Sequence, residues 1–133
     1  MTACYLDASA VVKLATVEAE SVPLHLHLDR YAARVTSRLS RVEVSRALLR
    51  RVPPNDAATD AISTVFDGLL IVELDESVVA VAARLEPPAL RSLDAVHLAS
   101  ALAMRDELEA LVTYDRRLAD AARGAGLRVV SPA

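Results

Sequence analysis

The sequence predicts an α/β protein in which helices cover both faces of a small, mostly parallel sheet. Short apolar runs of strand character alternate with longer runs of helical spacing along the 133 residues. Strands separated by helices need crossover connections, which produce parallel pairing and a three-layer α/β/α arrangement. Because the chain is 53% hydrophobic but only 3% aromatic, we expect a core built mainly of Leu, Val and Ala.

The first half of the chain is expected to form two strands and four helices. Pro23 should lie near a helix start, where its missing N–H is not needed. The run VPPN at 52–55 should end a helix, because the residue before a proline is pushed out of the helical region. The expected elements are strands at 4–6 and 34–37 and helices at 9–15, 18–32, 38–51 and 56–69.

The second half continues the alternation. The β-branched run LIVEL is typical of a buried strand, the pair Pro87 and Pro88 should end a helix, and Ser92 is a candidate N-cap for the next one. The expected elements are strands at 70–74, 110–114 and 127–131 and helices at 76–86, 92–107 and 115–126. No repeat or linker interrupts this pattern, so residues 1–133 are expected to form a single domain.

Composition limits the compartment and the partners. A single cysteine, Cys4, allows no intramolecular disulfide, and its apolar strand suggests a small buried hydrophobe in a reducing cytoplasm. We expect no leader segment and no membrane span, because no apolar run approaches the roughly 18 residues that a bilayer requires. The net charge of −3 argues against broad, sequence-independent binding of nucleic acid.

Arginines are nevertheless concentrated in one segment of this acidic chain. An ordinary solvated helix face is one interpretation. The other is a rim that contacts phosphates, for which Arg38, Arg41, Arg46 and Arg50 are the candidate residues. The segment contains Arg30, Arg34, Arg38, Arg41, Arg46, Arg50 and Arg51.

Two acids follow predicted strands directly. Asp7 comes after the first strand and Asp115 after the run LVTY. In open parallel sheets, ligands bind outside the carboxyl ends of the strands, near the point where the strand order reverses. Each acid could instead be a simple helix N-cap, a position that Asp fills well.

Two further acids lie on predicted helices. Glu43 falls between Leu39 and Ala47 on the helical wheel, near the apolar stripe, although an intrahelical pair with a neighbouring arginine would also account for it. Asp94 lies in the first turn of its helix, where the helix dipole favours an acid. It also shares a face with Leu98, which should turn inward, and an uncompensated charge there would be costly.

Together the four acids suggest a metal site. Carboxylates that converge on one crevice repel each other and raise some of their pKa values, and a divalent cation removes that conflict. Ligands that are all oxygen suit Mg²⁺ or Mn²⁺, and the absence of Cys or paired His ligands argues against zinc or copper.

Three neighbouring polar residues are candidates for supporting this site. Ser9 is expected to cap the first helix or to bond Asp7. His97 is expected either to be satisfied by a neighbour, such as Asp94 or a water, or to orient a ligand. Thr113 is expected to be structural within its strand or to help line the site.

Four segments in order, LDASAVVKL, SRLSRVEVSRAL, SLDAVHLASALA and LVTYDRRLADAARGAGLRVVSP, closely resemble the PIN domain, and within it the VapC toxins of bacterial toxin-antitoxin pairs. The resemblance covers essentially the whole chain. It implies a Mg²⁺- or Mn²⁺-dependent endoribonuclease, usually a homodimer, that leaves 5′-phosphate and 3′-hydroxyl ends and is inhibited by a VapB-type antitoxin. The metal-binding quartet of the family carries over as Asp7, Glu43, Asp94 and Asp115. A fifth ligand at Asp120 is not expected.

Two rival functions make different demands on the sequence. Haloacid-dehalogenase-like phosphatases need a second Asp two residues after the first, where this chain has Ser9. Those enzymes and response-regulator receivers also need a late lysine, whereas the only lysine here is Lys13, in the first helix. The other alternative is a PIN-like module that binds RNA or protein without cleaving, which the presence of all four acids argues against.

Overall fold

The central layer of the protein is a five-stranded sheet, seen in a computed structural model that describes residues 2–51 and 55–133. All neighbouring strands are parallel, and their order is β3-β2-β1-β4-β5. The order reverses between β1 and β4, which is where such sheets bind ligands. The strands are β1 (Ala3–Leu6), β2 (Ala33–Ser37), β3 (Leu70–Val72), β4 (Leu108–Val112) and β5 (Val129–Val130).

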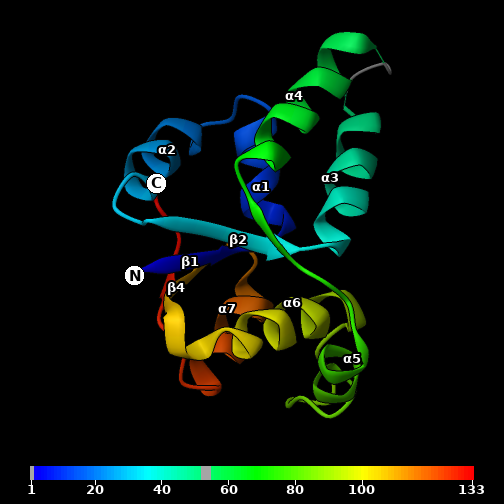
Figure 1. The fold of residues 1–133 in the computed structure, drawn as a ribbon, viewed down its shortest axis with the longest axis vertical. Coiled ribbons are helices and arrows are strands. Elements are labelled where there is room, and N and C mark those ends of the chain that lie inside the picture. Colours follow the sequence, from blue (N-terminus) through cyan, green and yellow to red (C-terminus); the bar gives the residue numbers. More distant parts are fainter. Residues whose placement is uncertain (1, 52–54) are drawn as a thin grey trace.

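Seven α-helices in the described residues cover the two faces of the sheet (Figure 1). The helices α1 (Ala8–Ala15), α2 (Ser21–Leu28), α3 (Leu39–Leu49) and α4 (Asp56–Asp67) lie on one side, and α5 (Glu76–Ala82), α6 (Ser92–Ala103) and α7 (Arg116–Gly124) lie on the other. A short 3₁₀ turn, Arg105–Glu107, follows α6. The predicted three-layer α/β/α fold is confirmed.

Alternation along β1 divides the core into two parts. Cys4 and Leu6 pack with α1, α2, α3 and α4, whereas Ala3 and Tyr5 pack with α6 and α7, as the two-residue period of a strand requires. Burial raises the pKa of the Cys4 thiol to about 12, so this residue is the inert, buried hydrophobe that its position in the strand predicts. Leu, Val and Ala dominate both parts, as the composition predicts.

The edges of several elements differ from the sequence prediction. The strand predicted at 70–74 is present, but the predicted burial is wrong, because β3 is a short edge strand in which Leu70 is 59% exposed. Ser92 is not an N-cap but the first residue of α6, and the capping residue, Arg91, makes no side-chain cap. Pro23 does lie in the first turn of α2.

The remaining differences concern element ends. The helix predicted at 92–107 ends at Ala103 and gives way to the 3₁₀ turn. The run VPPN falls mostly at 52–54, outside the described residues. In the part of the chain that the structure covers, no helix is long and apolar enough to cross a membrane.

Candidate active site

Asp7 lies at the carboxyl end of β1 and caps α1. Its Oδ1 accepts hydrogen bonds from the Ser9 hydroxyl at 2.7 Å and the Ala10 N–H at 3.1 Å, and its Oδ2 accepts one from the Thr113 hydroxyl at 2.7 Å. The residue is only 3% exposed. Asp7 is therefore both a helix cap and a rigidly held acid at the switch point of the sheet, so the two interpretations of its position are compatible.

Burial raises the pKa of the Asp7 carboxyl above its ordinary value. The nearby His97 and the hydrogen bonds from Ser9, Thr113 and Ala10 act in the opposite direction without cancelling the burial. A carboxylate that is held by neutral donors but removed from water is a group that a bound cation would stabilise.

Thr113 connects this acid to the next. It donates to Asp7, and its Oγ1 accepts the Asp115 N–H at 3.0 Å. Asp115 caps α7, its Oδ1 accepting from the N–H groups of Arg117 at 2.9 Å and Leu118 at 3.1 Å. The contacts made by Ser9 and Thr113 are those of residues that support the acids, and they place the loops after β1 and β4 side by side.

Asp94 lies in the first turn of α6, with a side chain that is 16% exposed. Partial burial is the largest cause that raises the pKa of the Asp94 carboxyl, and the nearby charges of Asp115 and Glu43 raise it further. The closest cation is Arg91, whose Nε lies 4.0 Å from Oδ2. Mutual repulsion among acids, which the sequence predicted for a shared crevice, therefore acts on this carboxyl.

Glu43, on α3, reaches across to the opposite helical layer. Its Oε1 lies 2.6 Å from Nε2 of His97, on α6, and Nδ1 of the same ring lies 2.7 Å from the Tyr5 hydroxyl. His97 is thus satisfied by Tyr5 and Glu43, not by Asp94 as suggested from its helical position. Glu43 likewise pairs with His97 and not with an arginine of its own helix.

Buried hydroxyl groups fix the start of α3. The Thr36 hydroxyl bonds the Leu6 carbonyl and the Ser40 hydroxyl, each at 2.6 Å, and Ser37 accepts the Leu39 N–H at 3.1 Å. Because Ser40 is nearly one turn before Glu43, these contacts tie the position of that acid to β1 and β2.

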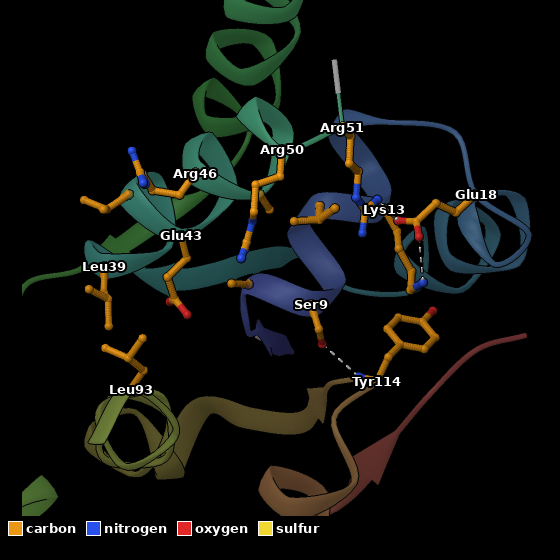
Figure 2. A pocket seen from close by; sticks show the side chains of 14 residues that line it. Ser9, Lys13, Glu18, Leu39, Glu43, Arg46, Arg50, Arg51, Leu93 and Tyr114 are labelled. Carbon is orange, nitrogen blue, oxygen red and sulfur yellow. Dashed lines mark hydrogen bonds and ion pairs between the residues drawn. The ribbon is translucent and has the colours of Figure 1, made fainter. Parts of the chain in front are cut away.

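A cleft of about 560 Å³ opens beside these acids (Figure 2). Glu43 and Arg50 point into it, and Ser9, which bonds Asp7, lies at its floor. The lining combines an apolar wall with a basic rim, and α3 contributes side chains to both. The lining includes Leu39, Val42, Ala47 and Leu93 among the apolar residues and Lys13, Arg46, Arg50 and Arg51 among the basic ones.

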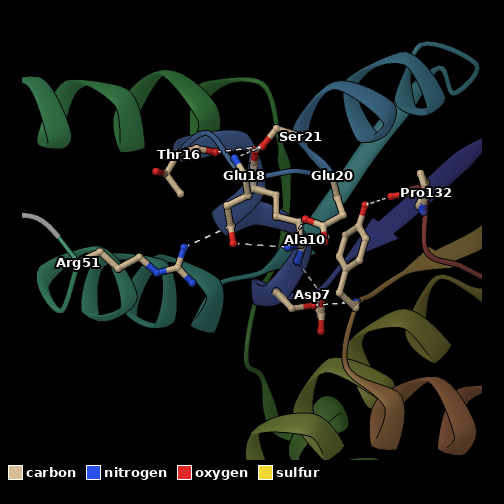
Figure 3. Close-up of polar contacts among 11 residues, drawn as sticks. Asp7, Ala10, Thr16, Glu18, Glu20, Ser21, Arg51 and Pro132 are labelled. Carbon is tan, nitrogen blue, oxygen red and sulfur yellow. Dashed lines mark hydrogen bonds and ion pairs between the residues drawn. The ribbon is translucent and has the colours of Figure 1, made fainter.

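The basic rim is partly neutralised. Glu18 lies 3.5 Å from Lys13 and 3.3 Å from Arg51, and Glu20 lies 3.1 Å from Lys13 (Figure 3). Lys13 also lies 4.7 Å from the centre of the Tyr114 ring. Sequence reasoning did not assign Lys13 or Tyr114 to the site, because nothing in the local pattern indicates that α1 faces the loop after β4.

The four arginines predicted to bind RNA separate into two pairs. Arg46 and Arg50 line the cleft. Arg38 is instead paired with Glu73, with Nε 3.1 Å from Oε2, and Arg41 lies 5.1 Å from the centre of the Phe66 ring. The two pairs lie on different faces of α3, so closeness in sequence does not produce a single basic rim.

The structure also bears on metal binding. Asp120 is 81% exposed and lies 3.6 Å from Arg123, so its carboxylate is solvated and paired with an arginine of its own helix. Within residues 2–51 and 55–133, no three or more His, Cys, Asp or Glu side chains form a group ready to hold an ion. The donors of the quartet are nevertheless all carboxylate oxygens, which is the chemistry that Mg²⁺ and Mn²⁺ prefer.

Comparison with known proteins identifies the family. The model of the PIN domain matches residues 4–124. The chain is 42% identical to Ribonuclease VapC46 of Mycobacterium tuberculosis over 132 residues, 99% of each chain.

Two solved structures share the fold. VapC20 of Mycobacterium tuberculosis, described as a sarcin-ricin loop cleaving toxin, has a TM-score of 0.70 at 19% identity, covering 97% of this chain and 99% of that one. VapBC2 of Rickettsia felis, bound to a DNA fragment from its promoter, has a TM-score of 0.75 at 12% identity, covering 99% and 100%. The family match and the full-length identity agree: this chain belongs to the PIN domain family and, within it, to the VapC ribonucleases.

Proposed function

We propose that this protein is an endoribonuclease toxin that hydrolyses RNA phosphodiester bonds with the help of Mg²⁺ or Mn²⁺. The observation that supports the proposal is that Asp7 and Asp115 follow the two strands at the switch point of a PIN-type sheet, and that the charges of Asp115 and Glu43 act on Asp94. The full-length similarity to Ribonuclease VapC46 supports the same activity.

The residues of the quartet fit a hard divalent cation and would hold it through their carboxylate oxygens. When bound, such an ion lowers the pKa of a coordinated water and stabilises the charge that develops on the phosphate. The burial that raises the pKa of Asp7 and Asp94, and the repulsion that Asp115 adds at Asp94, are unfavourable terms that a cation would relieve. Asp7 is held at both carboxylate oxygens and is the most rigidly positioned donor.

Arg46 and Arg50 are the proposed contacts to the RNA backbone, because they line the cleft that contains Glu43. Arginine forms charge-assisted bonds with phosphate oxygens, and such contacts would align the scissile phosphate with the acids. Arg51 is less available, since Glu18 already pairs with it. The apolar wall formed by Leu39, Val42 and Leu93 offers a surface for unpaired bases, the form in which sequence-specific proteins usually read RNA.

A VapB-type antitoxin is the proposed regulator, by analogy with the complex from Rickettsia felis. The cleft has the features that an inhibitory peptide would need, with an apolar wall for its side chains and carboxylates that an antitoxin arginine could pair with. Co-expression with the product of the neighbouring gene should suppress cleavage and yield a complex that co-purifies. Failure of both would contradict this part of the proposal.

A homodimer in the cytoplasm is the proposed state of the free toxin. Exposed apolar side chains on and beside α5, namely Leu74, Val79 and Val81, support a protein interface on that side. Light scattering of the isolated chain should give twice the mass of 14.2 kDa, and a monomer at micromolar concentration would contradict the dimer.

Cleavage of total cellular RNA by the purified, antitoxin-free protein tests the central proposal. Mg²⁺ or Mn²⁺ should produce discrete cuts with 5′-phosphate ends, and EDTA or Asp94→Asn should abolish them. Asp120→Asn, which removes an exposed acid outside the quartet, is the matched control and should cleave normally. A folded, metal-loaded protein that binds RNA without cutting it would favour a non-catalytic binding module.

A further inference from the structure

A hydrogen-bonded chain of three side chains links the buried core to the acidic quartet. Tyr5 on β1 bonds His97 on α6 at 2.7 Å, and His97 bonds Glu43 on α3 at 2.6 Å. Tyr5 and His97 are 0% and 1% exposed, and their rings meet edge to face with centroids 5.8 Å apart. This network therefore joins the sheet to the layer that contains α6 and, through His97, to the layer that contains α3.

The hydrogen-bonding capacity of the three groups assigns the protons. A carboxylate can only accept, so Nε2 of His97 must carry the hydrogen that Glu43 receives. The other ring nitrogen, Nδ1, is held by the Tyr5 hydroxyl. Burial raises the pKa of Tyr5, which keeps the proton on that hydroxyl.

We propose that Tyr5, acting through His97, is a positioning residue for Glu43. The proposal rests on the proposed function, in which Glu43 is one of the metal-binding carboxylates. By bonding Nδ1, Tyr5 fixes the orientation of the ring, so that Nε2 presents a donor to Oε1. Glu43 is a solvent-accessible side chain on a helix that lines the cleft, and without this anchor it would sample other rotamers.

A second tyrosine–histidine pair in the protein provides an internal control for this proposal. Tyr31 and His27 form a second Tyr–His pair, with the Tyr31 hydroxyl 2.9 Å from Nε2 and ring centroids 5.4 Å apart. Tyr31 is also largely buried, at 6% exposure, but this pair belongs to α2 and the loop after it and contacts none of the four acids through the bonds described. Removing either hydroxyl deletes one tyrosine–histidine bond, and only Tyr5 is connected to Glu43.

The test compares Tyr5→Phe with Tyr31→Phe in the full-length protein. Removing a group that bonds a metal ligand directly typically weakens metal affinity or activity about 10- to 100-fold, and Tyr5 acts one bond further out, through His97. Tyr5→Phe should therefore bind Mn²⁺ about tenfold more weakly, at the low end of that range, lower kcat and leave the KM for RNA unchanged, whereas Tyr31→Phe should match the wild type. Equal Mn²⁺ affinity and kcat in Tyr5→Phe and wild type would overturn the proposal.

Two further measurements separate positioning from general stability. In the Glu43→Gln background, Tyr5→Phe should cause no additional loss of Mn²⁺ affinity, because the residue acts through that acid; an undiminished loss would overturn the proposal. The chain has only three histidines, so ¹⁵N spectra of the wild type can report the His97 tautomer directly, with the signal assigned by its absence in His97→Gln.

The spectra should show a proton on Nε2, the nitrogen that faces Glu43, and a ring without a proton on Nε2 would overturn the proposal even if Tyr5→Phe failed to fold. Failure of the proposed function has a different signature, since the wild type itself would then neither bind Mn²⁺ nor cleave RNA.

Discussion

Asp7→Asn is expected to be less stable than the wild type when a divalent cation is present and more stable than the wild type when it is absent. Asparagine has nearly the same shape, can still accept the Ala10 N–H, and is as good an N-cap as aspartate. The Ser9 and Thr113 hydroxyls can rotate to suit an amide. The substitution therefore removes the buried charge while keeping the fold of the site.

The loss of cation binding sets the size of the first effect. At a concentration of 100 times Kd, a cation that binds only the folded state stabilises it by about 2.7 kcal/mol. For 133 residues, an unfolding entropy of about 280 cal/mol/K converts this into a rise in Tm of about 10 °C. If Asp7→Asn weakens binding about 100-fold, the same cation concentration adds only about 0.4 kcal/mol, or about 1.5 °C.

The second effect follows from the pKa of Asp7, which burial raises above its ordinary value of 3.8. The folded protein then holds this proton more tightly than the unfolded chain, so stability is lost as the pH rises from 3.8 through the folded-state pKa and stays lost above it. Asparagine cannot ionise. In EDTA at neutral pH, Asp7→Asn should be more stable than the wild type, and the difference should disappear below about pH 3.8.

Thermal unfolding in EDTA and in Mn²⁺, across the pH range, measures both effects. Asp120→Asn is the matched control, because its side chain is 81% exposed, and it should retain the full gain from Mn²⁺. A Mn²⁺-induced rise in Tm as large in Asp7→Asn as in the wild type would refute the assignment of Asp7 as a ligand. A variant that is less stable than the wild type in EDTA at neutral pH would refute the argument from burial.

Two other perturbations test the surroundings of the acids. Thr113→Val removes a hydroxyl donor from buried Asp7 and should lower the free energy of unfolding in urea by about 1–3 kcal/mol. The double variant Arg46→Ala with Arg50→Ala should reduce the slope of log K against log salt for single-stranded RNA by about 1.4, since each phosphate contact contributes about 0.7. Arg38→Ala, which removes an arginine paired with Glu73, should leave that slope unchanged.

The Thr113→Val prediction has a matched control, and each of the two predictions has a result that would contradict it. Thr59→Val removes an exposed hydroxyl that bonds a backbone carbonyl, and a surface change of this kind should stay within about 0.5 kcal/mol. Equal losses of unfolding free energy in Thr113→Val and Thr59→Val would show that the bond to Asp7 stabilises the protein no more than a surface hydrogen bond does. An equal salt slope in the double arginine variant and the wild type would remove Arg46 and Arg50 from the RNA interface.

Local sequence patterns were sufficient for much of the fold. Apolar runs separated by helical spacing predict a parallel sheet, and the acids after the first and fourth strands lie at its carboxyl edge as expected. Local patterns fail where the place of an element in the tertiary structure decides its burial. The run LIVEL has the composition of a buried strand, yet β3 is at the sheet edge and Leu70 is exposed, because strand order is a property of the whole chain.

The partners of the site residues were less predictable for the same reason. His97 is three residues from Asp94, but it bonds Tyr5 and Glu43, which are 92 and 54 residues away. The arginines of α3 are close in sequence, yet Arg38 and Arg41 turn to Glu73 and Phe66. Helical spacing gives the direction of a side chain relative to its own helix and not the residues that the fold brings to meet it.

The position of bound Mn²⁺ tests the central claim most directly. Crystals of the wild type grown with Mn²⁺ should show an anomalous peak among the carboxylate oxygens of Asp7, Glu43, Asp94 and Asp115, and crystals of Asp94→Asn should show a weaker peak or none. If crystals of protein that cleaves RNA in Mn²⁺ show no peak among these oxygens, or a peak only elsewhere, the four carboxylates are not the metal site of this ribonuclease.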